Sequence, residues 1–381
     1  MKKVLILVQS HVSRDNRVKR QIEWLKGKYE IFLSAIDAPI DFPKENFYPL
    51  PFFKNVRGGR FSILLQALLA NSGFFSKYHF IHFFHNNTLR QLKGLELDLI
   101  IANDANALPL AYQLKQNKPG IKLIYDDHEY APTEYEGNRT WEFLYKPINL
   151  ILLKRISLVD QVVTVGYFIA DRFRRDYQVD PLVITNAPPR YIIQSENRNS
   201  DKIRLIHHGI TSKERQPELM IEMASHLDNR FELYFMLMGE SKYLEELQEL
   251  AKPVGDKIKF MKPVGSNEIV KFISQFDIGV YILPPLNFTF LNALPNKLFE
   301  FIQAGLAIAI APSKEMAKIV NEYNIGVVST DFSAKSLATE INKITKEMLV
   351  KFKQNTGKAA DELNAENNGI LFLKMVDNLV S

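Results

Sequence analysis

The segment from Ala293 to Gly305 combines residue types that suit the binding of a negatively charged group. Pro295 is favoured in the first turn of a helix, and Gly305 is typical just past a helix end, so we expect a short helix here. A helix N-terminus presents unpaired N–H groups and a partial positive charge, and Lys297 adds a full charge. This turn, which also holds Asn296, predicts a site for an anion such as a diphosphate.

Glu300 lies one helical turn beyond Lys297 and is reached from the same direction. Its carboxylate can accept hydrogen bonds from a pair of sugar hydroxyls. The alternative is an i,i+3 salt bridge with Lys297, which contributes only about 0.2–0.5 kcal/mol to a helix.

A second cation follows a predicted strand over 204–208. Gly209 lets the backbone turn sharply after this strand, and the guanidinium of Arg215 can fork onto phosphate oxygens. Together with Lys297, these residues predict two cations and a helix end around one crevice, which is what a nucleotide diphosphate requires.

Polar residues also follow apolar strands in the first half of the chain. Ligands of an open parallel sheet bind outside the carboxyl ends of its strands, so these residues are site candidates. Four ionisable residues from Asp126 to Glu129 exceed what a helix cap needs. We predict a site role for His128, with Asp127 and Glu129 fixing its tautomer. Asp104 is predicted as the N-cap of a helix over 105–116.

Several classes of protein and site are disfavoured. The adjacent carboxylates of Asp126 and Asp127 can hold a magnesium ion, but the spacing is weak evidence and we predict no metal site. The chain lacks a G-x-G-x-x-G after its first strand and lacks a P-loop, which argues against dinucleotide oxidoreductases and P-loop kinases. It has no cysteine, which excludes disulfides, thiolate catalysis and Cys-based metal sites.

The candidate residues need strands that end at the site, and the chain supplies two series of them. Apolar runs alternate with helical patterns, as in parallel sheets covered on both faces. Strands are predicted over 3–8, 30–35, 98–102, 122–125, 161–165 and 182–185, then over 204–208, 232–238, 257–261, 277–283, 306–311 and 326–329. A polar linker over 186–201 separates the series. We predict an α/β fold of two doubly wound, Rossmann-like domains, 1–188 and 189–360, with a final helix over 361–381 crossing back to the first domain.

Composition and charge indicate how many domains the chain can form, where the protein acts and what it contacts. A chain of 381 residues with 46% apolar and 24% charged residues is long enough for two globular domains. No apolar run reaches about 18 residues and no cleavage site follows the first one, so we expect a cytoplasmic protein. The net charge of +5 is concentrated in residues 1–60, which hold 12 basic and 6 acidic side chains. This basic part suits an anionic membrane surface, whereas nucleic acid is not an expected partner because no motif for it is present.

The segment from 42 to 95 departs from the alternation of strands and helices, because aromatic residues are interleaved there with cations. Such a segment suits either an interfacial membrane contact or a helical hairpin packed on the sheet. His79, His82 and His85 would share one helix face, where they either gather a metal ion or remain surface histidines of an amphipathic helix.

Three groups of residues resemble motifs of a known family. Residues 15–20 resemble the D-x-R-V-x-R opening of this family. Two further segments are similar to the family's H-x-x-D and Y-D-x-H-E motifs, namely Asn103-Asp104 and the run from Tyr125 to Glu129. Residues 295–305 closely resemble a P-N-K-L-F-E-Y-x-x-A-G block. The family is that of the GT-B-fold glycosyltransferases, and within it family 4, the retaining group 1 type. The resemblance runs over nearly the whole chain.

The resemblance implies a fold, a reaction and roles for individual residues. Two Rossmann-like domains would face a central cleft, the first binding the acceptor and the second the donor. A hexose would pass with retention from a UDP- or GDP-sugar to a saccharide or lipid-linked acceptor, in the synthesis of a surface polysaccharide or glycolipid, without an obligatory metal or other cofactor. His128, Glu300 and Asp127 are the implied catalytic residues, and Glu300 would also bind the donor ribose. The implied donor-binding residues are Gly209, Arg215, Asn292, Asn296, Lys297 and Glu300.

Two residues depart from the family pattern. The first glutamate of the family's E-x7-E motif falls on Asn292, which keeps a hydrogen-bond acceptor but loses the negative charge. The arginine that commonly follows the glycine of the first loop is replaced by Ile210. Donor preference is therefore open.

These departures leave two other functions to consider. One is a sugar-nucleotide epimerase of the same fold, whose acid and base would be found among Asp104, Asp127 and Glu129. The other is a degenerate, non-catalytic partner subunit of a transferase. The protein would act either free in the cytoplasm or peripherally on the inner face of the cell membrane.

Overall fold

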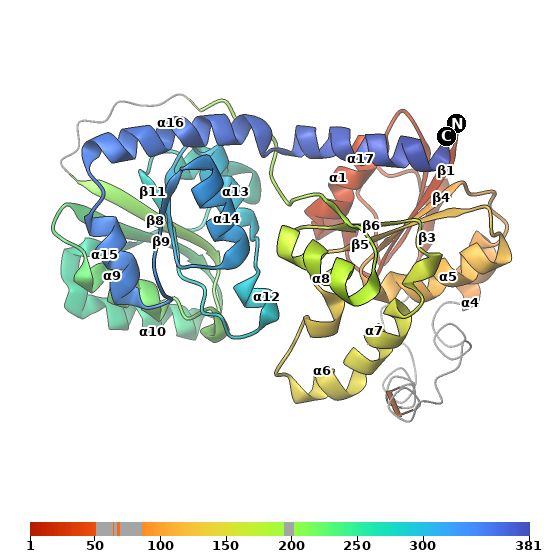
Figure 1. Cartoon of the computed structure of the whole chain (residues 1–381), viewed down its shortest axis with the longest axis horizontal. Coiled ribbons are helices and arrows are strands. Elements are labelled where there is room, and N and C mark those ends of the chain that lie inside the picture. Colours follow the sequence, from red (N-terminus) through yellow and green to blue (C-terminus); the bar gives the residue numbers. More distant parts are fainter. Residues whose placement is uncertain (51–63, 65–66, 69–85, 194–201) are drawn as a thin grey trace. The chain divides into compact units, whose positions relative to one another are not determined.

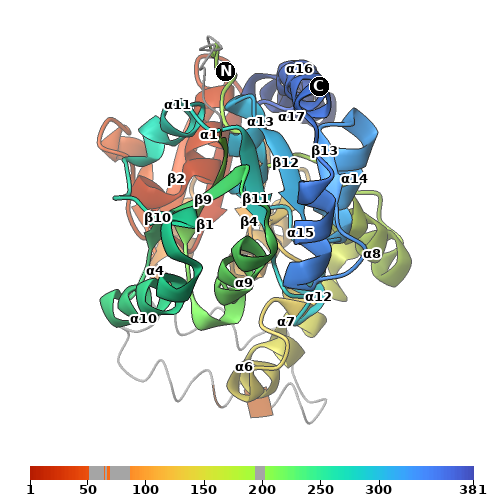
Figure 2. The same cartoon turned by 90° about the vertical axis from the view of Figure 1, so that its left-hand side faces the viewer.

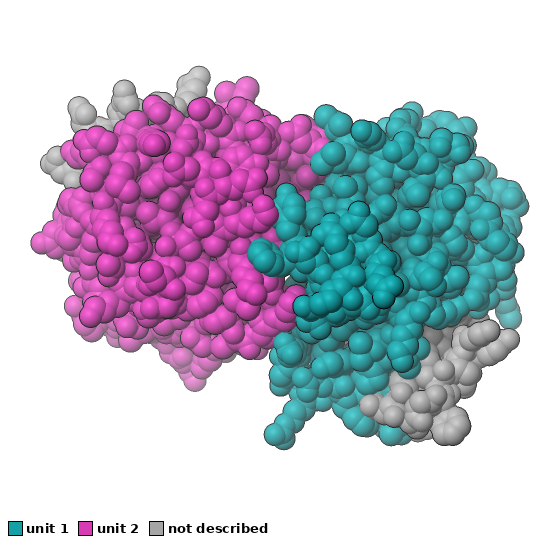
Figure 3. All heavy atoms as spheres, in the orientation of Figure 1, with its two compact units in different colours: residues 1–184, 369–381 teal, residues 185–368 magenta. Residues whose placement is uncertain are grey.

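The computed structural model describes residues 1–50, 64, 67–68, 86–193 and 202–381. The chain forms two compact units, unit 1 with residues 1–184 and 369–381 and unit 2 with residues 185–368 (Figure 3). His79, His82, His85, most of the aromatic and cationic segment, and residues 194–201 of the predicted linker lie outside the described residues.

Unit 1 is built on a parallel sheet that, in the described residues, has seven strands in the order β3-β2-β1-β4-β5-β6-β7 (Figure 1). The strands are β1 (Lys3–Val8), β2 (Glu30–Ala35), β3 (Phe47–Pro49), β4 (Leu99–Asn103), β5 (Lys122–Asp127), β6 (Gln161–Thr164) and β7 (Leu182–Val183). The helices are α1 (Asn16–Leu25), α4 (Asn86–Leu92), α5 (Leu108–Asn117), α6 (Arg139–Leu144), α7 (Lys146–Leu153), α8 (Tyr167–Tyr177) and, from Gly369 onward, α17 (Ala365–Val380).

Helices α1 and α17 cover one face of this sheet. Asp15 caps α1 by accepting hydrogen bonds from the backbone N–H groups of Arg17 and Val18. The apolar side of α1 and the buried residues of α17 share one core with alternate residues of β1. The rings of Trp24 and Phe372 lie 5.4 Å apart in this core. The last helix of the chain is therefore part of unit 1.

Unit 2 repeats the same plan, with a parallel sheet of six strands in its described part, in the order β10-β9-β8-β11-β12-β13. The strands are β8 (Ile203–Ile210), β9 (Phe231–Met238), β10 (Ile258–Phe260), β11 (Ile278–Tyr281), β12 (Ala307–Ile310) and β13 (Gly326–Val328). The helices are α9 (Glu218–His226), α10 (Ser241–Ala251), α11 (Ile269–Ile273), α12 (Phe288–Leu291), α13 (Asn296–Gln303), α14 (Lys314–Tyr323), α15 (Ala334–Asn342) and α16 (Lys346–Glu362).

The helices of unit 2 cover both faces of its sheet. Helices α9, α10 and α15 pack together on one face, and α11, α13 and α16 pack together on the other (Figure 2). A glycine allows α13 to approach the sheet, because a Cβ atom on Gly279 of β11 would lie only 2.3 Å from the ring of Phe301 in α13. This contact determines how close the first turn of α13 comes to the end of β11.

The predicted secondary structure agrees closely with these elements. Each predicted strand is present, with bounds that differ by at most two residues. Among the strands of the described residues, the short β3 was missed, because its three residues, which include Pro49, lie in the segment that we interpreted as an insert. In both sheets the strand order reverses beside the first strand of the unit, β1 or β8, which places the expected ligand sites at the carboxyl ends of β1 and β4 and of β8 and β11.

Candidate functional site

The predicted donor-binding residues of unit 2 gather at the carboxyl ends of β8 and β11. Strand β8 supplies Gly209, and the 3₁₀ helix Lys213–Arg215 that follows it supplies Arg215. Helix α13 begins at Asn296, after Pro295 in extended conformation, and its first two turns carry Lys297 and Glu300. Residues far apart in the sequence thus meet at one edge of the sheet.

Two cations lie on either side of Tyr281, the last residue of β11. The ammonium of Lys297 lies 4.0 Å from the centroid of the Tyr281 ring, and Arg215 Nη1 lies 3.4 Å from its hydroxyl oxygen. Lys297 is only 7% exposed. Burial, reinforced by the Arg215 charge and partly offset by Glu300, lowers the pKa of Lys297 to about 7. Its charge therefore changes within the physiological pH range.

Gly209 has a role that differs from the predicted one. It lies within β8 rather than in a turn after the strand, and its φ is +112°, a conformation that favours glycine. A Cβ atom there would lie 3.7 Å from Lys297 Nζ. Gly209 therefore leaves open the space beside the Lys297 ammonium.

Glu300 does not form the i,i+3 ion pair that we considered as the alternative to a binding role. Its carboxylate lies 3.5 Å from His208 Nε2 instead. Burial raises the pKa of Glu300 to about 7, against the opposing effect of Lys297. Burial and Lys297 lower the pKa of His208 to about 3, so its ring is neutral at pH 7. Neither ring nitrogen of His208 has a hydrogen-bond partner among the described residues.

The two asparagines differ in their accessibility. Asn292 is buried at the end of α12, where its side-chain amide donates a hydrogen bond of 2.8 Å to the carbonyl oxygen of Phe288. One of its two amide protons is therefore used to end a helix. Asn296 is exposed at the first position of α13.

In unit 1, Asp126 is held by a buried ion pair. Arg17 of α1 pairs with its carboxylate, and Gln21 Nε2 donates a hydrogen bond of 2.5 Å to the same group. The Gln21 amide also exchanges two hydrogen bonds of 3.0 Å with Asn103. Asp127 faces a different partner, the backbone N–H of Ala131 at 3.2 Å. The two aspartates therefore do not form a shared ligand pair, and no group of three or more metal-ligating side chains occurs within the described ranges.

His128 pairs with Asp104, a carboxylate that we did not predict as its partner. His128 Nδ1 lies 3.4 Å from Asp104 Oδ1, so a residue that follows another strand of the sheet lies beside this nitrogen. Asp104 occupies the predicted N-cap position, ahead of the 3₁₀ helix Ala105–Ala107 that leads into α5, but its side chain makes no capping hydrogen bond. His128 Nε2 is buried without a hydrogen-bond partner in the described structure.

Two carboxyl groups near His128 have raised pKa values. Burial raises the pKa of Asp104 to about 6 against the opposing charge of Arg17. Burial, together with the charge of Asp104, raises the pKa of Asp127 well above its usual range. Carboxyls with raised pKa values are typical of functional sites.

Sequence reasoning missed two residues of the unit 2 site, His207 and Tyr281. Both lie inside predicted strands, where an aromatic side chain is expected to be core. The available signal was their position, since each lies in the carboxyl-terminal half of a strand next to the reversal in strand order.

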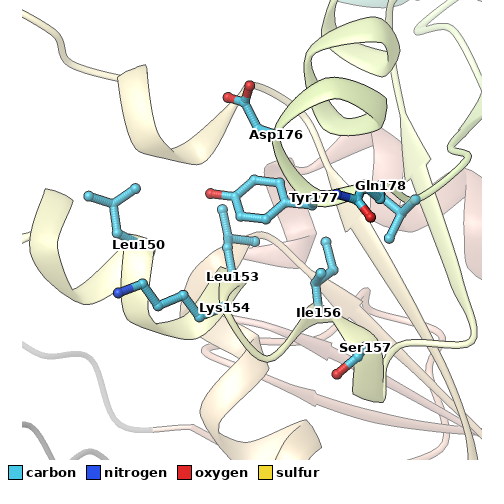
Figure 4. Close-up of a pocket in the computed structure, with 9 residues that line it drawn as sticks. Leu150, Leu153, Lys154, Ile156, Ser157, Asp176, Tyr177 and Gln178 are labelled. Atoms are coloured by element: carbon cyan, nitrogen blue, oxygen red, sulfur yellow. The ribbon is translucent and has the colours of Figure 1, made fainter.

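A separate pocket of about 600 Å³ lies in unit 1 between α7 and α8 (Figure 4). Its walls are mainly apolar and include Leu150, Leu153, Ile156 and Tyr177, with Asp176 at one side. None of the predicted site residues lines it.

Comparison with known proteins identifies the fold and the family. Residues 190–363 match the family model of glycosyl transferases group 1, and residues 56–188 match that of glycosyltransferase family 4. No curated protein matches the sequence.

Solved structures share the fold at low sequence identity. The chain is similar to HepE from Anabaena, solved with UDP, at 12% identity and a TM-score of 0.70 over 99% of this chain and 100% of that one. It is also similar to sucrose-phosphate synthase from Thermosynechococcus elongatus, at 13% identity and a TM-score of 0.70 over 100% and 99%. WaaG, a glycosyltransferase involved in lipopolysaccharide biosynthesis, is similar at 14% identity and a TM-score of 0.62 over 96% and 99%.

Two Rossmann-like units of this kind define the GT-B fold of glycosyltransferases. Family models of glycosyltransferases match both halves of the chain, which is therefore a family 4-like glycosyltransferase. The resemblance seen in the sequence is thereby confirmed.

We predict that Asp126→Asn destabilises unit 1 by about 3–5 kcal/mol, because it leaves the Arg17 guanidinium buried without its partner. Arg17→Met in the same chain should restore part of this loss. Both tryptophans, Trp24 and Trp141, belong to unit 1, so denaturant unfolding followed by tryptophan fluorescence reports on this unit.

The matched control is Asp180→Asn, which removes a carboxylate from an exposed ion pair with Arg174 and should cost less than about 1 kcal/mol. Equal effects of the two aspartate variants would contradict the structural role of Asp126.

Proposed function

We propose that this glycosyltransferase moves a hexose, with retention of anomeric configuration, from a UDP- or GDP-sugar to a hydroxyl group of a saccharide or lipid-linked acceptor. The observation that carries the proposal is the pair of cations, Lys297 and Arg215, on either side of Tyr281, with Glu300 one helical turn from Lys297. HepE, which has a similar fold, was solved with UDP and with UDP-glucose.

In this proposal unit 2 binds the donor and unit 1 binds the acceptor. Lys297 and Arg215 stabilise the negative charge that grows on the departing diphosphate as the glycosidic bond breaks. Because two protein cations supply this charge, no metal ion is obligatory. Glu300 accepts hydrogen bonds from the donor ribose, and Asn292, Asn296 and Gly209 line the donor site.

His128 contacts the donor sugar in this scheme, and Asp127 supports the same region as the other catalytic residue in unit 1. The acceptor hydroxyl attacks from the face that the diphosphate leaves, and its proton passes to the departing phosphate oxygen. The new glycosidic bond then has the configuration of the old one.

We predict that Arg215→Ala and Glu300→Ala abolish transfer, lowering kcat/KM by about 100-fold or more, because each removes a charged contact to the donor. A thermal-shift screen of UDP- and GDP-sugars first identifies the donor, since a ligand that binds only the folded form raises the Tm. Transfer is then measured by nucleotide release with a panel of acceptors, and NMR of the product gives its anomeric configuration.

Lys213→Ala is the matched control, because Lys213 lies in the same 3₁₀ helix but faces Glu246 at 3.8 Å. It should retain activity within about twofold. Normal transfer by both Arg215→Ala and Glu300→Ala would overturn the site assignment, and absence of nucleotide binding by the wild type would favour a non-catalytic partner subunit.

Binding of UDP should weaken as the pH rises above 7. The pKa of Lys297 is about 7 in the free protein, and a bound diphosphate raises it, so binding takes up a proton. We expect the affinity to fall by up to about tenfold per pH unit from pH 7.5 upward, where terminal phosphates are already ionised.

Calorimetry in buffers of different ionisation enthalpy measures both the affinity and the proton uptake. Lys297→Arg, which stays charged throughout, should show a flatter pH profile. A wild-type affinity that does not change between pH 7.5 and about 9 would contradict the lowered pKa of Lys297.

A sugar-nucleotide epimerase remains the second candidate, because the carboxyls of Asp104 and Asp127, with raised pKa values near His128, suit acid–base chemistry. Incubation with a nucleotide sugar and no acceptor separates the two functions. Only the epimerase would form a new sugar nucleotide.

We also propose that the protein acts in the cytoplasm and binds peripherally to an anionic membrane that presents a lipid-linked acceptor. The basic residues of the first 60 positions support this, and no helix in the described ranges has the length and apolar character needed to span a bilayer. Sedimentation with anionic vesicles should show binding that weakens with salt, whereas neutral vesicles serve as the control. Equal sedimentation with both, or none with either, would remove this proposal.

A further inference from the structure

Three aromatic rings, on the neighbouring strands β9, β8 and β11 of unit 2, lie next to one another beside the two cations. Phe235 of β9 is paired in register with His207 of β8, and Tyr281 ends the next strand, β11. The His207 ring lies 6.1 Å from Phe235, edge to face, and 5.2 Å from Tyr281. His207 is 3% exposed and Tyr281 is 2% exposed, so both rings are held by packing.

The hydrogen bonds of His207 define its tautomer. His207 Nδ1 lies 2.9 Å from the carbonyl oxygen of Val280. A carbonyl oxygen can only accept, so Nδ1 carries the hydrogen and Nε2 presents a lone pair. That lone pair faces Lys297 Nζ at 3.4 Å. His207 is therefore built to accept a hydrogen bond from the ammonium.

Tyr281 contacts both cations with different parts of its side chain. The face of the ring lies under the Lys297 ammonium, which is a cation–π contact. The hydroxyl oxygen faces Arg215 Nη1. A single buried side chain therefore constrains the separation of the two positive charges.

We propose that His207 and Tyr281 are positioning residues, which hold Lys297 and Arg215 at the spacing needed to grip one diphosphate. Neither residue contacts the donor; each acts through a cation. This inference rests on the proposed function, because it assumes that Lys297 and Arg215 bind the diphosphate of a nucleotide sugar.

The surrounding charges support a neutral His207. Burial, Lys297, His208 and Arg215 together keep the pKa of His207 well below its usual range, so Nε2 remains an acceptor at pH 7. The charged groups that act on Lys297 are Arg215, from the 3₁₀ helix, and Glu300, from α13 itself. A variant that removes the His207 lone pair leaves these groups in place and should lower the pKa of Lys297 further.

The test compares two variants of His207, one that keeps an aromatic ring and one that keeps a hydrogen-bond acceptor. His207→Phe keeps an aromatic ring but removes the lone pair, and His207→Gln places an amide oxygen within reach of Lys297. We expect His207→Phe to weaken UDP binding and lower kcat/KM about tenfold, which corresponds to one hydrogen bond to a charged group. The fall in UDP affinity with pH should begin at lower pH than in the wild type. His207→Gln should restore part of both effects.

Tyr281→Phe provides a second, smaller change that keeps the ring under Lys297 and removes only the hydroxyl beside Arg215. It should weaken UDP binding by a few-fold without shifting the pH profile as His207→Phe does. Combined with Arg215→Ala, it should have little further effect, since both changes remove the same contact.

Wild-type UDP binding and its loss in Lys297→Met establish that the cation site itself functions. If these hold while His207→Phe matches the wild type in affinity and in pH profile, the positioning role is overturned. If the wild type fails to bind UDP, it is the proposed function that fails. A Tm of His207→Phe close to that of the wild type shows that any loss is not unfolding.

Discussion

The proposed donor site of unit 2 depends on the burial of one ammonium, that of Lys297, beside a second positive charge, the half-buried Arg215. Taking an ammonium out of water costs several kcal/mol, and a neighbouring guanidinium adds repulsion. For Lys297 this cost is offset by the Tyr281 ring face, the His207 lone pair and the Glu300 carboxyl. The remaining imbalance appears as a pKa of about 7, and in the proposed function a bound diphosphate would supply the negative charge that offsets it.

Unit 1 also contains a buried positive charge, but there a partner of opposite charge compensates it. Arg17 and Asp126 are buried as a pair of opposite charges, with Gln21 satisfying further hydrogen bonds. This pair fastens α1 to the end of β5 and so places the next residues of the chain, Asp127 and His128. In unit 1 the opposite charges therefore compensate each other, whereas the like charges of unit 2 leave a positive charge without a full partner.

The similar solved structures and the contacts within each unit support different conclusions about this protein. Structures that are 12–14% identical show that the fold is that of GT-B glycosyltransferases, but they do not assign roles to side chains. Those roles rest on contacts within each unit, such as Glu300 beside His208 and Asp104 beside His128. Asn292 likewise makes a local contact, a hydrogen bond from its side-chain amide to the last turn of α12.

The sequence alone determined the strands, the short helix α13 and the presence of two cations near strand ends, because apolar periodicity, Pro295 and Gly305 are local signals. The partners of the site residues were decided only by the tertiary structure. His207 and Lys297 are 90 positions apart, and Asp104 lies beside His128 because the strands that precede them, β4 and β5, are neighbours in the sheet. Gly209 is a similar case. The sequence predicts a turn residue, whereas in the structure Gly209 lies within β8 and the Lys297 ammonium lies beside it. Local propensity cannot encode such contacts, since they arise when separate strands and a helix are brought to one edge of a sheet.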